Sequence, residues 1–181
     1  FFVRSFIVKS LYFIKVKEKY MEYLKRFDSK IQDNSCLKNN KPYIGVLIKN
    51  DNGQKYFAPL SSPKEKHKIF DKLQKENKLP VDVFIIRDSD DKILGIINFN
   101  NMIPVIDSAI IYFNIKEDPN YSLLKKEHIY CIKHSEEILK KSKKVYNLVT
   151  KYKKESLVKR SCNFKLLEEK AKEIDNTVVN K

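Results

Sequence analysis

The spacing of apolar residues changes at Asp118-Pro119, and this change limits the folds that the chain can adopt. Before it, short runs rich in β-branched and aromatic residues alternate with polar turn residues, a pattern typical of strands. After it, apolar residues recur three or four positions apart in a Lys-rich background, which is the spacing of amphipathic helices. Strands followed by helices predict an α+β fold built on an antiparallel sheet.

The predicted strands are short and follow one another closely. They cover residues 12–16, 43–49, 55–60, 81–87, 93–99 and 102–111. The segment Asn50-Asp51-Asn52-Gly53-Gln54 is a hairpin signal between the second and third strands. The acidic turn at 88–91 joins the fourth and fifth strands in the same way. Such tight connections favour antiparallel pairing of consecutive strands.

Helical spacing marks three further segments. Residues 20–27 place four apolar side chains at i, i+3, i+4 and i+7. The segment from Ile138 to Tyr152 keeps the same spacing within the basic C-terminal third. A final helix runs from Phe164 to Ile174, with Asn163 as its predicted N-cap.

Length and composition predict one domain. The 181 residues, 42% of them hydrophobic, suffice for a single core, so we assign 12–181 to one domain and 1–11 to an N-terminal extension of unclear role. Arg4 and Lys9 interrupt the apolar start, which excludes a transmembrane helix or signal peptide there. Three widely spaced cysteines, without a C-x-x-C pair, predict a reducing, cytoplasmic location and no structural zinc.

The charge of the chain indicates a polyanionic partner. Thirty-seven Lys and Arg residues against 23 Asp and Glu give a net charge of +14. Nucleic acid is the partner that such a balance favours, because each phosphate contact releases condensed counterions. A membrane surface is the alternative, but the apolar stripes of the predicted helices are needed for the core. A basic solvated surface without a partner is the third interpretation.

One segment combines hydroxyl groups with nearby cations. The strand ending at Leu60 runs into Ser61 and Ser62, which lie between Pro59 and Pro63 and are followed by Lys64, Lys66 and His67. Proline restricts its own φ and the conformation of its predecessor, so the two hydroxyls have little freedom. The segment therefore predicts a phosphate site, although a polar turn before a basic helix has the same composition.

Other reaction classes lack the residues they need. Three glycines cannot build a Gly-rich nucleotide loop, and the acidic residues are too scattered for two-metal hydrolysis. Ser62 has no glycine neighbours to form a nucleophile elbow. We therefore expect no metal and no cofactor, and RNA cleavage in which the ribose 2′-hydroxyl is the nucleophile. A basic RNA-binding module without catalysis is the alternative.

Several blocks in the chain resemble one toxin family. From 12 to 174 the sequence is similar to the ToxN/AbiQ toxins of type III toxin-antitoxin systems. The blocks that carry the resemblance are Tyr20…Tyr23-Leu24-Lys25-x-Phe27-Asp28, Lys41-Pro42-Tyr43-Ile44-Gly45-Val46, Lys55-Tyr56-Phe57-Ala58-Pro59-Leu60-Ser61-Ser62-Pro63-Lys64, Asn98…Met102-Ile103-Pro104-Val105 and Cys162-Asn163-Phe164-Lys165-Leu166-Leu167-Glu168-Glu169-Lys170.

The resemblance implies an activity and a partner. It implies a metal-independent endoribonuclease that leaves a 2′,3′-cyclic phosphate, built on a strongly twisted antiparallel sheet like that of the MazF/Kid toxins. The toxin would process a small RNA pseudoknot antitoxin, which then occupies and inhibits the active-site groove in a closed toxin–RNA assembly. Free toxin would cut cellular or phage mRNA and cause growth arrest or abortive infection.

The resemblance also assigns catalytic residues. Ser62 matches the hydroxyl whose loss inactivates such toxins, with a role in phosphate contact or proton transfer. Lys64 matches the active-site lysine that stabilises the phosphorane charge. Ser61 replaces a common threonine, and Lys41 matches a second groove lysine. From the residues alone, Ser61 is also a candidate turn or helix cap, and Lys41 a candidate solvated loop lysine.

The predicted RNA contacts come from three places in the chain. Tyr20 matches a tyrosine that faces the RNA, but it also belongs to the apolar stripe of its helix. Lys66 and His67 follow the active-site lysine, and His67 suits phosphate contact or packing. The family would allow the basic helix carrying Lys140 and Lys144 to grip the antitoxin RNA, although it is equally an exposed face.

Overall fold

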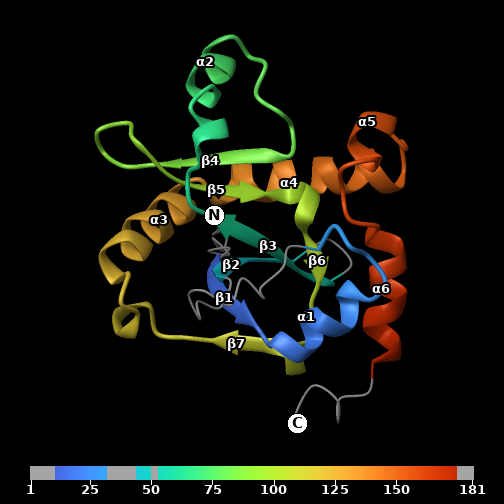
Figure 1. Cartoon of the computed structure of the whole chain (residues 1–181). Coiled ribbons are helices and arrows are strands. Elements are labelled where there is room, and N and C mark those ends of the chain that lie inside the picture. The colour runs from blue at the N-terminus through green and yellow to red at the C-terminus, as the bar shows by residue number, and fades with distance from the viewer. Residues whose placement is uncertain (1–10, 32–43, 50–52, 175–181) are drawn as a thin grey trace, which may run out of the picture.

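The computed structural model describes residues 11–31, 44–49 and 53–174 (Figure 1). In this part of the chain seven strands form one antiparallel sheet in the order β4-β5-β3-β2-β1-β7, with β6 paired to β3. The strands are β1 Tyr12–Val16, β2 Ile44–Lys49, β3 Lys55–Ser61, β4 Val83–Arg87, β5 Ile93–Asn98, β6 Ile103–Pro104 and β7 Ile110–Tyr112. The predicted α+β class with an antiparallel sheet is confirmed.

Helices pack around the sheet. They are α1 Glu18–Lys25, α2 Phe70–Lys75, α3 Tyr121–Lys133, α4 Ser135–Thr150, α5 Glu155–Val158 and α6 Phe164–Glu173. Figure 1 shows α3 on one side of the strands and α1 with α6 on the other, while α2 projects beyond β4. The predicted N-cap of α6 is confirmed, since the Asn163 side chain accepts a hydrogen bond from the Leu166 amide. None of the helices in the described ranges is long and apolar enough to span a membrane.

The prediction of one extended run over 102–111 is wrong. The structure divides it into β6 and β7, separated by a 3₁₀ turn at Asp107–Ala109. β6 pairs with β3, whereas β7 pairs with β1, two strands further along the sheet. A single straight strand cannot reach both partners, so the chain must bend between them.

Strand β3 changes partners near its end. Residues 55–59 pair with β2, while Leu60 and Ser61 pair with Ile97 and Ile96 of β5. The end of β3 is therefore held by the β4–β5 hairpin. This places the hydroxyl-rich segment at the junction between the two parts of the sheet.

Close packing in the central strands fixes the position of β3. Phe57 is almost fully buried, and a Cβ atom at Gly45 on β2 would overlap both the Phe57 ring and the Ala58 carbonyl oxygen. Only glycine allows this approach of β2 to β3. The interior is completed by aromatic side chains from α1, α6 and the 3₁₀ turn Phe99–Asn101, namely Tyr20, Phe164 and Phe99.

Candidate active site

The Ser61–Lys64 segment leaves the sheet at the end of β3. Ser61 is the last residue of the strand and is half-buried, whereas Ser62, Pro63 and Lys64 are exposed. The Ser61 hydroxyl accepts a hydrogen bond of 3.0 Å from the Asn98 amide on β5 and lies 3.5 Å from the Ile96 carbonyl oxygen. Its partners thus lie on the neighbouring strand, and it does not act as a helix cap.

Asn98 was not predicted as a site residue. It belongs to one of the blocks that resemble the toxin family, but no local pattern indicates that its amide reaches a serine 37 positions earlier. The pairing of β3 with β5 supplies that information.

The backbone of Lys64 is fixed by His67. The Lys64 amide donates to His67 Nδ1 at 2.9 Å, and the His67 amide donates to the Lys64 carbonyl oxygen at 2.8 Å. His67 is only 5% exposed, and its ring packs on Phe70 with centroids 4.9 Å apart. Of its two predicted roles, packing is the one that this burial supports. The Lys64 side chain leaves this rigid turn toward solvent.

Tyr20 lies in the core. It is fully buried, and its hydroxyl donates to the Pro104 carbonyl oxygen at 2.8 Å. Burial raises its pKa well above the ordinary value. A ring without exposed surface cannot stack on an RNA base, so the structure supports the core alternative. The reason is that the apolar stripe of α1 faces the sheet and carries Tyr20 with it.

The lysines of α4 differ in how far their side chains are exposed. Lys140 and Lys144 are exposed. Lys141 is half-buried and donates to the Val83 carbonyl oxygen at 3.2 Å, and burial lowers its pKa. The exposed pair lies on a different element from the Ser61–Lys64 segment. Lys41 and the Lys66 side chain lie outside the described residues.

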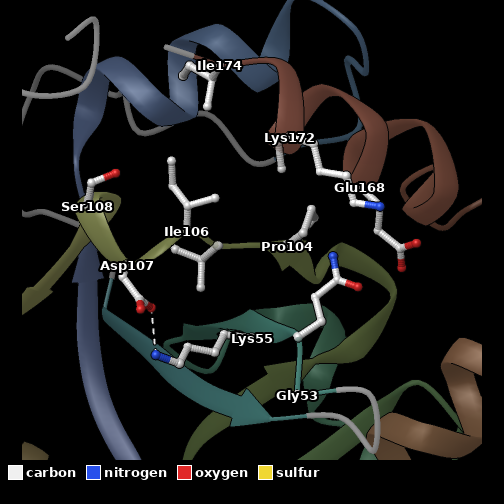
Figure 2. Close-up of a pocket in the computed structure, with 12 residues that line it drawn as sticks. Gly53, Lys55, Pro104, Ile106, Asp107, Ser108, Glu168, Lys172 and Ile174 are labelled. Carbon is white, nitrogen blue, oxygen red and sulfur yellow. Dashed lines mark hydrogen bonds and ion pairs between the residues drawn. The ribbon is translucent and has the colours of Figure 1, made fainter. Parts of the chain in front are cut away.

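A pocket of about 860 Å³ lies elsewhere, between α6 and strands β3 and β6 (Figure 2). On its wall Lys55 Nζ and Asp107 Oδ1 are 2.6 Å apart and point toward one another. Glu168, also on its wall, accepts hydrogen bonds from the hydroxyls of Tyr56 and Tyr146. None of the predicted site residues that the structure describes lines this pocket.

Among the residues with described positions, no group of three or more His, Cys, Asp or Glu side chains is arranged to hold a metal ion.

Comparison with known proteins identifies the family. The model of the toxin ToxN family of type III toxin-antitoxin systems matches residues 12–172. The chain belongs to the ToxN family. It is 35% identical over 173 residues to the endoribonuclease AbiQ of Lactococcus lactis subsp. lactis, covering 94% of this chain and 93% of that protein. It is 34% identical over 163 residues to the endoribonuclease ToxN of Pectobacterium atrosepticum, covering 87% of this chain and 90% of that protein.

Solved structures of the ToxN family share this fold. The structure of AbiQ, a lactococcal anti-phage endoribonuclease, aligns with a TM-score of 0.74 at 34% identity, covering 90% of this chain and 96% of AbiQ. A second solved structure is that of a type III toxin selectively inhibited by a non-coding RNA pseudoknot. It aligns with a TM-score of 0.74 at 30% identity, covering 91% of this chain and 97% of that toxin. The family resemblance predicted from the sequence is confirmed.

Proposed function

We propose that this endoribonuclease toxin cuts RNA at the exposed end of β3, where Ser61, Ser62 and Lys64 receive the scissile phosphate. The ribose 2′-oxygen attacks the adjacent phosphorus, and the bond from phosphorus to the 5′-oxygen breaks. The products are a 2′,3′-cyclic phosphate and a free 5′-hydroxyl. No metal ion is required in this scheme, because the substrate supplies its own nucleophile.

The rigidity of the Ser61–Lys64 segment carries the proposal. Ser61 is held by Asn98, the Lys64 backbone is held by His67, and the Ser62 and Lys64 side chains between these fixed points are exposed. Preorganised donors and cations stabilise charge that develops in a transition state without reorganising during the reaction. Lys64 would stabilise the phosphorane charge, and Ser62 would contact the phosphate or move a proton.

The partners follow from the family and from charge. Like the relative inhibited by an RNA pseudoknot, this chain would bind such an RNA antitoxin in a closed toxin–RNA assembly. The net charge of +14 and the exposed Lys140 and Lys144 suit a folded polyanion. Released toxin would cut cellular or phage mRNA in the cytoplasm and arrest growth, as expected of a relative of an anti-phage endoribonuclease.

The experiment is a cleavage assay in excess EDTA with protein freed of bound RNA. We expect the unmodified chain to cut RNA, and Ser62→Ala and Lys64→Ala to cut it at least about 100-fold more slowly. The matched controls are Ser122→Ala and Lys126→Ala, which change exposed residues of α3. The proposal would be overturned if the unmodified chain cut RNA only without EDTA, or if Ser62→Ala kept full activity. Binding without any cleavage would favour the non-catalytic RNA-binding module.

A further inference from the structure

A buried carboxyl group lies behind the Ser61–Lys64 segment. Glu127 of α3 is 3% exposed. Desolvation is the one influence on the protonation of its carboxyl group that the described residues show. Burying a carboxyl group is unfavourable, and a buried titratable group needs an explanation in a native fold.

A glycine on β5 makes room for this carboxyl group. A Cβ atom at Gly95 would overlap Glu127 Oε1 and would lie 3.6 Å from the Ser61 carbonyl oxygen. The Glu127 carboxyl and the end of β3 thus meet beside the same residue of β5. Any side chain at Gly95 would displace the carboxyl group.

The pairing of β3 with β5 brings Gly95 to the end of β3. Leu60 pairs with Ile97 and Ser61 with Ile96, which is the last pair, so Gly95 is the next residue of β5 beside the end of β3. A Cβ atom at Gly95 would meet the Glu127 carboxyl group, so this position faces the side of the sheet that α3 covers. Ser62 is the first residue of the chain beyond the strand, and it is exposed.

The protonation of Glu127 is set by burial. Desolvation raises its pKa to about 7 from the ordinary 4.5, with no contribution from a neighbouring charge. The titratable and charged groups on the elements packed around α3 include Lys15 of β1, Arg87 of β4, Glu137 and Lys141 of α4, and Lys116 and Glu117 of the 3₁₀ turn Ile115–Glu117. In α3 itself, Lys125, Lys126, His128, Tyr130 and Cys131 lie within one turn of Glu127. Arg87 is paired with Asp71, and Lys15 with Asp118. A group with a pKa near 7 transfers protons efficiently at neutral pH.

We propose that Glu127 is a positioning residue of the RNA-cleavage site that accepts, through the Ser62 hydroxyl, the proton of the attacking 2′-hydroxyl. The inference rests on the proposed function. As the bond from the 2′-oxygen to phosphorus forms, the 2′-hydroxyl proton passes to Ser62 Oγ, and the proton of Ser62 passes to the Glu127 carboxylate. The departing 5′-oxygen keeps the electron pair of its broken bond and takes a proton from the Lys64 ammonium group. Water restores both groups afterwards.

Single-turnover cleavage rates between pH 5 and 9 test the inference. The unmodified chain should gain activity with rising pH and level off near pH 7, because the carboxylate is the competent form. Glu127→Gln keeps the shape of the side chain but cannot accept the proton, so we expect a loss of about 100-fold or more and no bend near pH 7. Glu127→Asp keeps the carboxyl group but shortens the side chain by one methylene. We expect slower cleavage with this variant, and a pH–rate profile that still levels off. Glu136→Gln, on the exposed surface of α4, is the control.

Stability separates this role from a structural one. Folding raises the pKa of Glu127, so protonation stabilises the native state below pH 4.5 and this contribution is lost as pH rises through 7. At pH 8 we expect Glu127→Gln to melt at the same temperature as the unmodified chain or higher, whereas a structural role predicts a lower one.

The possible failures are distinguishable. If Ser62→Ala is inactive while Glu127→Gln keeps the full rate and the bend, the proton role of Glu127 is refuted and the cleavage site stands. If Ser62→Ala remains active, the site itself is refuted. In the double variant, Glu127→Gln should add little to the loss already caused by Ser62→Ala, since the two residues form one relay.

Discussion

At the residue scale, His67 acts on the candidate site through the backbone. Its Nδ1 accepts the Lys64 amide proton, and its ring is held against Phe70. The lysine side chain that faces solvent therefore starts from a fixed Cα position. A buried residue can control an exposed one in this way without touching RNA.

Two substitutions of His67 test this control. His67→Leu removes the acceptor, and we expect kcat/KM for RNA cleavage to fall about 2- to 10-fold, the value of one net hydrogen bond. In His67→Asn the side-chain oxygen takes the place of Nδ1 and should restore much of the rate. RNA affinity should change little in either variant. Equal losses in both variants, with unchanged melting temperatures, would contradict the backbone role.

Single residues of the site differed in how far the sequence predicted them. Ser62 and Lys64 were recognisable because prolines and cations adjoin them in the chain, and the structure leaves both exposed. Asn98 and Glu127 were missed as members of the candidate site, because their side chains approach the end of β3 only through strand pairing and helix packing. For Tyr20 the residue pattern was more informative than the family resemblance. The apolar stripe that predicted its helix also explains its burial in the core.

At the element scale, β3 is positioned by how closely β2 approaches it. Gly45→Ala would force the new methyl group against the Phe57 ring and the Ala58 carbonyl oxygen. We expect the free energy of unfolding to fall by about 1–3 kcal/mol, measured by urea denaturation, because overpacking displaces backbone in a dense core. In Gly53→Ala the new methyl group would meet only Lys49 Cε, at 3.8 Å, and only the φ of +78° disfavours the change. We therefore expect a smaller fall in the free energy of unfolding for this variant. The reverse order would contradict close packing as the cause.

The elements also show what periodicity predicts. Strands β1 to β5 and helices α1, α4 and α6 repeat their apolar residues over enough positions to be recognised. The short helices α2 and α5 span six and four residues, too few for a helical repeat to stand out. The break between β6 and β7 depends on which distant strand each half joins, and no local spacing contains that information.

At the scale of the whole molecule, the excess of positive charge should appear in the salt dependence of RNA binding. Lys140 and Lys144 lie one helical turn apart on α4, and both are exposed. If both contact RNA phosphates, the double change to Ala removes two contacts and lowers the slope of log K against log salt by about 0.7 for each phosphate in a single strand. Cleavage by bound enzyme should be unaffected.

The matched control removes the same charge elsewhere. Lys19 on α1 and Lys116 in the 3₁₀ turn Ile115–Glu117 are also exposed, and their double change to Ala alters the net charge equally. Filter binding or fluorescence anisotropy with inactive Ser62→Ala protein, from 50 to 400 mM salt, gives both slopes. A slope reduced only for the α4 pair identifies this helix as part of the RNA surface. Equal slopes for the two variants would mean that α4 is a solvated face and that net charge alone attracts the RNA.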